Sequence, residues 1–201
     1  LCLGSGPSSN SPAALRAAGA ADAVFRVKHR WLKEGLIHRA DVSFSGTAET
    51  AKRLPRAIIL AQDEKTAGRM VLEWAWRGGF RRLKFGVVAD LAPGFVGTFS
   101  DGARLTNGAA MLATAIALRP KRLIVAGIDL YSHPEGAYPG AAEIWNDYAP
   151  AHDAARERAF ALTMLARQLA QAGPDGLSVI GPLGEIAREA GVAVPEDADC
   201  A

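Results

Sequence analysis

His152 is the residue best placed in this sequence for proton transfer. It follows Pro150 at the end of a segment rich in Gly, Pro and Tyr, and we expect it to open a long helix. A helix N-terminus favours the neutral imidazole, which is the form that accepts a proton. The position therefore predicts a general base, with a structural histidine as the alternative. His29, His38 and His133 lack comparable surroundings.

A run of small residues follows the first expected strand, where a phosphate or a sugar can approach backbone amides closely. As a dinucleotide fingerprint this run is incomplete, because Ser9 stands where Gly or Ala packs a helix against a strand. We interpret it as a nucleotide-binding loop, and a simple tight turn is the alternative. Its residues are Gly4, Ser5, Gly6, Pro7 and Ser8.

Two basic segments are candidates for binding an anion. FRVKHR, residues 25–30, is either a phosphate-binding strand end that includes Lys28 or a solvated basic edge. ARLTNG, residues 103–108, places polar side chains at the start of a helix, where the N–H groups and the helix dipole favour anions. Its candidates are Arg104, Thr106, Asn107 and Gly108, and helix capping is the alternative for Thr106 and Asn107.

A long segment at 130–151 interrupts the regular spacing of strands and helices. It follows the apolar strand of GIDLY, so we expect it to lie over the carboxyl edge of a parallel sheet and to act as a substrate lid. Asp129 and Tyr131 stand at the end of that strand, and Tyr138 and Tyr148 follow in the lid. Packing is the alternative role for these tyrosines.

Short apolar runs alternate with Ala- and Leu-rich helical segments along the whole chain. We expect strands at 1–4, 23–28, 41–45, 57–61, 83–89, 122–128 and 177–181, and helices at 12–18, 65–77, 107–118, 152–172 and 183–190. This alternation predicts an α/β fold, a three-layer α/β/α sandwich with a mostly parallel, Rossmann-like sheet. With 49% hydrophobic residues, the 201 residues are sufficient for a single domain over 1–201.

Composition excludes several classes of protein. A net charge of +2 argues against nucleic acid as a partner, and no run is long enough to span a membrane. Cys2 and Cys200 form neither a disulfide framework nor a zinc site, which favours a reducing, cytoplasmic location. No Asp-x-Asp follows a strand, so we expect no metal site. LCLGSG resembles a strand already under way, and we expect the natural product to begin a few residues earlier.

Taken in order, GSGPSS, DAVFRVK, VSFSG, ARLTNGAAMLATAIAL, LIVAGIDLY and the His152 helix resemble the bacterial sialyltransferases of glycosyltransferase family 42, which include lipooligosaccharide sialyltransferases. The similarity runs along nearly the whole chain. Its most specific parts are ARLTNGAAM together with GIDLY, the following Tyr138, and Tyr148 about one turn before His152.

The resemblance implies a variant nucleotide-sugar transferase fold and an inverting, metal-independent transfer from CMP-sialic acid, with no cofactor beyond this co-substrate. His152 would be the general base, and Tyr131 and Tyr138 would bind the leaving phosphate. Arg104 and Asn107 would lie near the phosphate or the sugar carboxylate. The remaining donor-binding residues would be Gly4, Ser5, Gly6, Pro7, Ser8, Lys28, Gly46, Thr106, Gly108, Asp129 and Tyr148.

The partners implied are a CMP-sugar donor and a glycan or lipooligosaccharide acceptor. The sequence leaves peripheral contact with the inner membrane and homo-oligomer formation open. The family usually has Asn where Ser5, Lys28 and Gly46 stand, so a catalytically impaired nucleotide- or sugar-binding relative is one alternative. An NADP-dependent reductase is another, because Arg26 and Lys28 end the second strand where a 2′-phosphate would lie.

Overall fold

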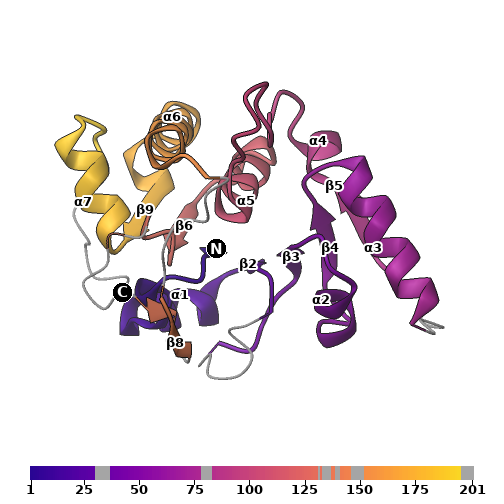
Figure 1. The fold of residues 1–201 in the computed structure, drawn as a ribbon. Coiled ribbons are helices and arrows are strands. Elements are labelled where there is room, and N and C mark those ends of the chain that lie inside the picture. The colour runs from indigo at the N-terminus through magenta and orange to yellow at the C-terminus, as the bar shows by residue number, and fades with distance from the viewer. Residues whose placement is uncertain are drawn as a thin grey trace.

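The fold is built on a sheet of parallel strands. The computed structural model describes residues 1–29, 37–77, 83–130, 132, 137–138, 141–145 and 152–195. Seven parallel strands pair in the order β5-β4-β3-β2-β1-β6-β9 (Figure 1). They are β1 (Cys2–Leu3), β2 (Phe25–Val27), β3 (Val42–Phe44), β4 (Ile58–Ala61), β5 (Phe85–Val87), β6 (Leu123–Ala126) and β9 (Leu177–Ile180). Each of the seven strands predicted from the sequence is present.

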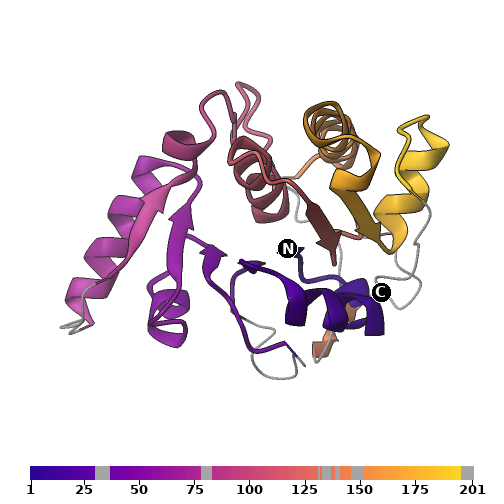
Figure 2. The same ribbon diagram turned by 180° about the vertical axis from the view of Figure 1, so that it is seen from behind.

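Helices cover both faces of this sheet. On one face lie α5 (Asn107–Ala117) and α6 (Ala154–Ala172), and on the other lie α1 (Pro12–Ala20) and α2 (Ala48–Arg53), as Figures 1 and 2 show from opposite sides. The remaining helices are α3 (Glu64–Trp76), α4 (Val88–Leu91) and α7 (Pro182–Glu189), with short 3-10 turns at Pro7–Asn10 and Pro174–Gly176. The predicted three-layer α/β/α fold is confirmed.

Alternation along the strands divides the core between the two faces. Cys2 and Val125 pack in one cluster with Met111 of α5 and Leu165 of α6. Their chain neighbours Leu3 and Ala126 point the other way and join a cluster with α1. This period of two is the behaviour of strands that are buried on both sides.

The sequence explains where most helices begin. The Ser11 side chain accepts a hydrogen bond from the Ala14 amide and Pro12 occupies the first position of α1. Thr106 caps α5 by accepting from the Ala109 amide, and Asp153 caps α6 by accepting from the Arg156 amide.

Three local predictions differ from the structure. The run 83–89 is divided, because β5 ends at Val87 and α4 begins at Val88. The six-residue helix α2 was not predicted. Within the expected lid, β7 (Ala137–Tyr138) pairs antiparallel with β8 (Ala141–Trp145), so two short strands lie where a loop was expected.

No helix among the described residues combines the length and the apolar composition needed to cross a lipid bilayer.

Candidate functional site

The centre of the site lies where β1 and β6 end side by side. The Gly4 amide donates to the Ala126 carbonyl at 2.8 Å. A Cβ atom added to Gly4 would lie 1.9 Å from the Gly127 carbonyl oxygen, and Gly127 itself has φ of +69°. Both positions therefore require glycine, because the two main chains touch there. Strand β1 lies between β2 and β6, so this is the point at which the strand order reverses, and ligands of open α/β sheets bind there.

Ser8 and Asp129 fix the loop that follows β1. The Asp129 carboxylate accepts from the Ser8 amide at 3.0 Å and from the Ser8 hydroxyl. The same hydroxyl accepts from the Gly127 amide at 2.7 Å. Since Ser8 and Asp129 are 6% and 3% exposed, this network is shielded from water. Asp129 thus ties the β1 loop to the β6 loop, and Gly6 adds a bond to the Gly127 carbonyl at 2.9 Å.

A cavity of about 340 Å³ opens above these loops, at the carboxyl ends of the strands. Most residues predicted from the sequence meet there, although Pro7 and Ser8 do not line it and are buried beside it. Tyr131 and Tyr148 lie outside the described residues, as does the side chain of Tyr138, whose backbone belongs to β7. The predicted residues that line the cavity are Gly4, Ser5, Gly6, Lys28, Gly46, Arg104, Thr106, Asn107, Gly108, Asp129 and His152.

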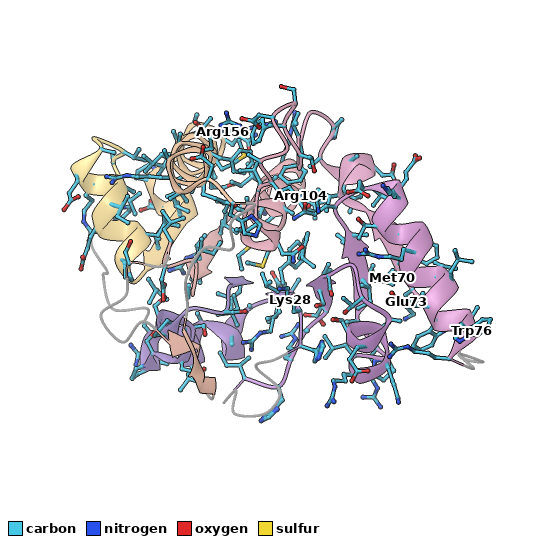
Figure 3. The ribbon with its side chains drawn as sticks, viewed as in Figure 1. Lys28, Met70, Glu73, Trp76, Arg104 and Arg156 are labelled. Carbon is cyan, nitrogen blue, oxygen red and sulfur yellow. The ribbon has the colours of Figure 1, made fainter. Side chains whose placement is uncertain are left out.

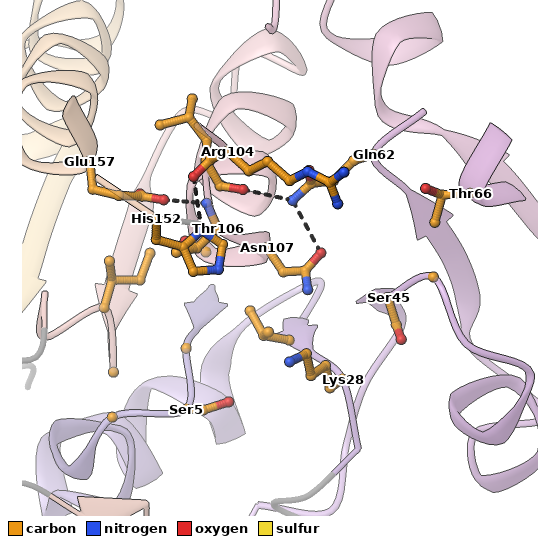
Figure 4. A pocket seen from close by; sticks show the side chains of 18 of the residues that line it. Ser5, Lys28, Ser45, Gln62, Thr66, Arg104, Thr106, Asn107, His152 and Glu157 are labelled. Atoms are coloured by element: carbon orange, nitrogen blue, oxygen red, sulfur yellow. Dashed lines mark hydrogen bonds between the residues drawn. The ribbon is translucent and has the colours of Figure 1, made fainter. Parts of the chain in front are cut away.

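The N-terminus of α5 contributes hydrogen-bond donors to this cavity. Gln62, which follows β4, donates through Nε2 to the Leu105 carbonyl at 3.1 Å and to Asn107 Oδ1 at 3.4 Å. Because the Asn107 oxygen is engaged by Gln62, its Nδ2 group is the end that turns toward the cavity (Figure 4). The helix dipole adds partial positive charge at the same place.

Lys28 faces this helix end from the other side. It directly follows β2 with φ of +56°, its amide donates to the Phe44 carbonyl at 3.0 Å, and its own carbonyl accepts from the Ser43 hydroxyl at 2.9 Å. Figure 3 shows Lys28 near the centre of the molecule, and Figure 4 shows it opposite Arg104 and Asn107. Lys28, Asn107 and the α5 N-terminus together form a site with the charge and the donors that a phosphate requires.

His152 lies at the edge of the cavity. Its Nδ1 is 2.8 Å from the Arg104 carbonyl oxygen. A carbonyl only accepts, so Nδ1 carries the proton in this bond, and Nε2 of the neutral ring keeps its lone pair. The expectation that His152 opens the helix is wrong, because α6 starts at Ala154 with Asp153 as its cap. The imidazole is held by the Arg104 carbonyl. The backbones of Arg104 and His152 also pair in an isolated parallel β-bridge.

Polar cavity residues that follow β3 and β4, next to the predicted Gly46, were not predicted from the sequence. Gly46 is tightly packed there, since a Cβ atom would lie 2.1 Å from Thr66 Cγ2. The signal that could have identified these residues is their position directly after two predicted strands. The carboxyl ends of those strands lie at the same edge of the sheet as the β1 loop. Glu157 was also missed, because nothing in the sequence of α6 distinguishes its first turn. The missed polar residues are Ser45, Thr47, Gln62, Asp63, Thr66, Arg69, Thr98 and Glu157.

One observation behind the reductase alternative does not hold. Arg26 is 1% exposed, and its Nη1 donates to the Ile37 carbonyl at 2.7 Å. It lies inside the protein and cannot receive a 2′-phosphate over the strand ends. Within the described residues there is also no group of three His, Cys, Asp or Glu side chains placed to hold a metal ion.

Comparison with known proteins shows similarity of fold. No protein-family model and no curated protein sequence matches this chain. Among solved structures, it is similar to a Tyr-to-Phe variant of the sialyltransferase CST-II in complex with CMP. The similarity has a TM-score of 0.55 at 14% identity and covers 98% of this chain and 86% of the other. The chain therefore shares its α/β fold with a CMP-bound sialyltransferase.

Proposed function

We propose that this protein is a glycosyltransferase that moves sialic acid or a related acidic sugar from a CMP-sugar to a hydroxyl of a glycan. The observation that carries the proposal is the hydrogen bond from His152 Nδ1 to the Arg104 carbonyl, which leaves Nε2 as a proton acceptor at the cavity. The fold shared with a CMP-bound sialyltransferase supports the choice of donor.

In the proposed reaction the acceptor oxygen attacks the anomeric carbon of the donor sugar. Its proton passes to His152 Nε2 as the new carbon–oxygen bond forms. The bond from the anomeric carbon to the phosphate oxygen breaks, and CMP leaves with that electron pair. One displacement of this kind inverts the configuration at the anomeric carbon.

The departing phosphate needs positive charge or hydrogen-bond donors. We assign this role to Lys28, Asn107 and the N-terminus of α5, which line one cavity. Arg104 is exposed at the same cavity and is assigned to the phosphate or the sugar carboxylate. Tyr131 and Tyr138 are proposed as further donors to the phosphate. With these groups we propose that the reaction needs neither a metal ion nor a cofactor.

The test is a pair of variants assayed for transfer and for CMP binding. His152→Ala is expected to abolish transfer while CMP still raises the melting temperature, because the base does not hold the nucleotide. His38→Ala is the control, since His38 is exposed and does not line the cavity. Ordinary transfer by the His152→Ala variant would contradict the assigned role.

A non-catalytic binding module is the second candidate. It is favoured by the close contact of Gly46 with Thr66, which leaves no room for the Asn that the similar family usually has at position 46. Release of CMP from the donor in the absence of acceptor separates the two functions. A transferase leaks donor to water, whereas a module that only binds releases no CMP.

A further inference from the structure

Glu157 is a buried carboxylate at the cavity for which the proposed reaction has no use. It lies in the first turn of α6, is 3% exposed, and accepts a hydrogen bond from the Thr106 amide. Burial raises the pKa of this carboxyl, and the bonds from Thr106 oppose that effect. A carboxylate in such a place is costly, so its contacts indicate what it does.

Capping of its own helix does not account for Glu157. The cap of α6 is Asp153, which accepts from the Arg156 amide at 3.1 Å. Arg156 points to the surface, where it forms an ion pair of 2.7 Å with Asp101. Glu157 instead reaches across to Thr106, the cap residue of α5. It therefore connects the starts of two helices that meet at the cavity (Figure 4).

This connection closes a ring with the hydrogen bond of His152. The chain runs from His152 to Glu157, then through the Glu157–Thr106 bond, back along the backbone to Arg104, and through the Arg104 carbonyl to His152 Nδ1. Two other bonds hold the middle of this ring, from the Leu105 amide to the Gly97 carbonyl at 3.0 Å and from Gln62 to the Leu105 carbonyl at 3.1 Å. Among these restraints, that of Glu157 comes from the helix that directly follows His152.

This closed circuit of bonds decides which nitrogen of the His152 imidazole carries the proton. His152 is only partly buried, so its orientation depends on the bond to the Arg104 carbonyl more than on packing. The tautomer of a neutral imidazole follows the hydrogen bond made by one of its nitrogens. If the peptide at 104–106 shifts, that bond is lost and Nε2 no longer stays unprotonated.

We propose that Glu157 is a positioning residue that holds the Arg104–Thr106 peptide in place and thereby selects the Nδ1–H tautomer of His152. The catalytic consequence rests on the proposed function, in which Nε2 receives the acceptor proton. Glu157 itself need not touch the substrate.

Histidine nitrogen NMR on the full chain, labelled with ¹⁵N in its histidines, tests this inference. The wild-type protein is expected to show the Nδ1–H tautomer for His152, whose signal is assigned as the one missing from His152→Ala. Glu157→Gln is expected to keep that tautomer, because the amide oxygen still accepts from Thr106. Glu157→Ala is expected to move it toward Nε2–H and to lower kcat about tenfold or more, with KM for the donor unchanged.

Glu185→Gln is the matched control, because Glu185 occupies the first turn of α7, is exposed, and does not line the cavity. If Glu157→Ala does not fold, Glu157→Asp replaces it, since the shorter side chain no longer reaches Thr106. A folded variant with an unchanged tautomer would overturn the positioning role. Because NMR needs no turnover, that failure is distinct from failure of the proposed function, which appears as absence of transfer in the wild type.

Discussion

The Ser8 hydroxyl forms two buried hydrogen bonds, so its removal is expected to lower the free energy of unfolding. Ser8→Ala removes the acceptor of the Gly127 amide and one donor to Asp129, and both lost bonds lie in the interior. The Ser8 amide still donates to Asp129, so one contact remains. Each buried polar group left without its partner costs about 1–3 kcal/mol. Two such groups predict a loss of about 3 kcal/mol of unfolding free energy.

For a domain of this size, that loss lowers the melting temperature by roughly 6–12 °C. Thermal and urea denaturation of Ser8→Ala measure it, and Ser9→Ala is the control. Ser9 is a neighbour that is 2% exposed and takes no part in the hydrogen bonds among Ser8, Asp129 and Gly127. Equal effects of the two substitutions, or a loss below about 0.5 kcal/mol for Ser8→Ala, would refute the argument that this network fixes the loop.

Three further predictions concern the cavity and its surroundings. Lys28→Asn is expected to keep the fold, since Asn tolerates φ of +56°. Loss of the charge is expected to weaken CMP binding about tenfold, measured by calorimetry. An unchanged affinity for CMP would argue against a contact between Lys28 and the phosphate. Gly46→Ala should destabilise the protein by about 1–3 kcal/mol, measured from melting curves. Thr66→Ser in the same chain should restore much of the lost stability, because it removes Cγ2. No recovery of stability would contradict the contact between position 46 and Thr66 Cγ2. The raised pKa of Glu157 means that the folded state holds the proton of this carboxyl more tightly than the unfolded state does. The contribution of Glu157 to stability is therefore present below the ordinary pKa of 4.5 and is lost as pH rises through the folded-state pKa. The melting temperature of Glu157→Gln relative to wild type should therefore increase upward from pH 4.5, and a constant difference would oppose this.

The sequence predicted the sheet well because its strands are short apolar runs separated by helical segments. Strand pairing order does not follow from such patterns, and neither does the division of 83–89 into β5 and α4, since Val87 and Val88 are equally apolar. Helix α2 was missed because six residues give too little periodicity to recognise.

The cavity was predicted in part because its residues follow strands. The Gly4 loop, Lys28 and Asn107 each stand at a strand or helix end that a parallel sheet brings to one edge. Glu157 and Gln62 were not foreseen, because their roles depend on contacts between segments 43 or more residues apart. The orientation of His152 likewise comes from a distant carbonyl and not from the helix that follows it.

The contact between Gly4 and Gly127 has a consequence for ligand exchange and redesign. With two main chains in contact, no ligand group passes between β1 and β6, and a ligand in the cavity must lie across both. That surface tolerates no new side chain on either glycine. For the proposed transferase, a change in which sugar is accepted is therefore expected to arise in the side chains around the cavity, such as Ser45, Thr66 and Arg69, while the base of the pocket is kept.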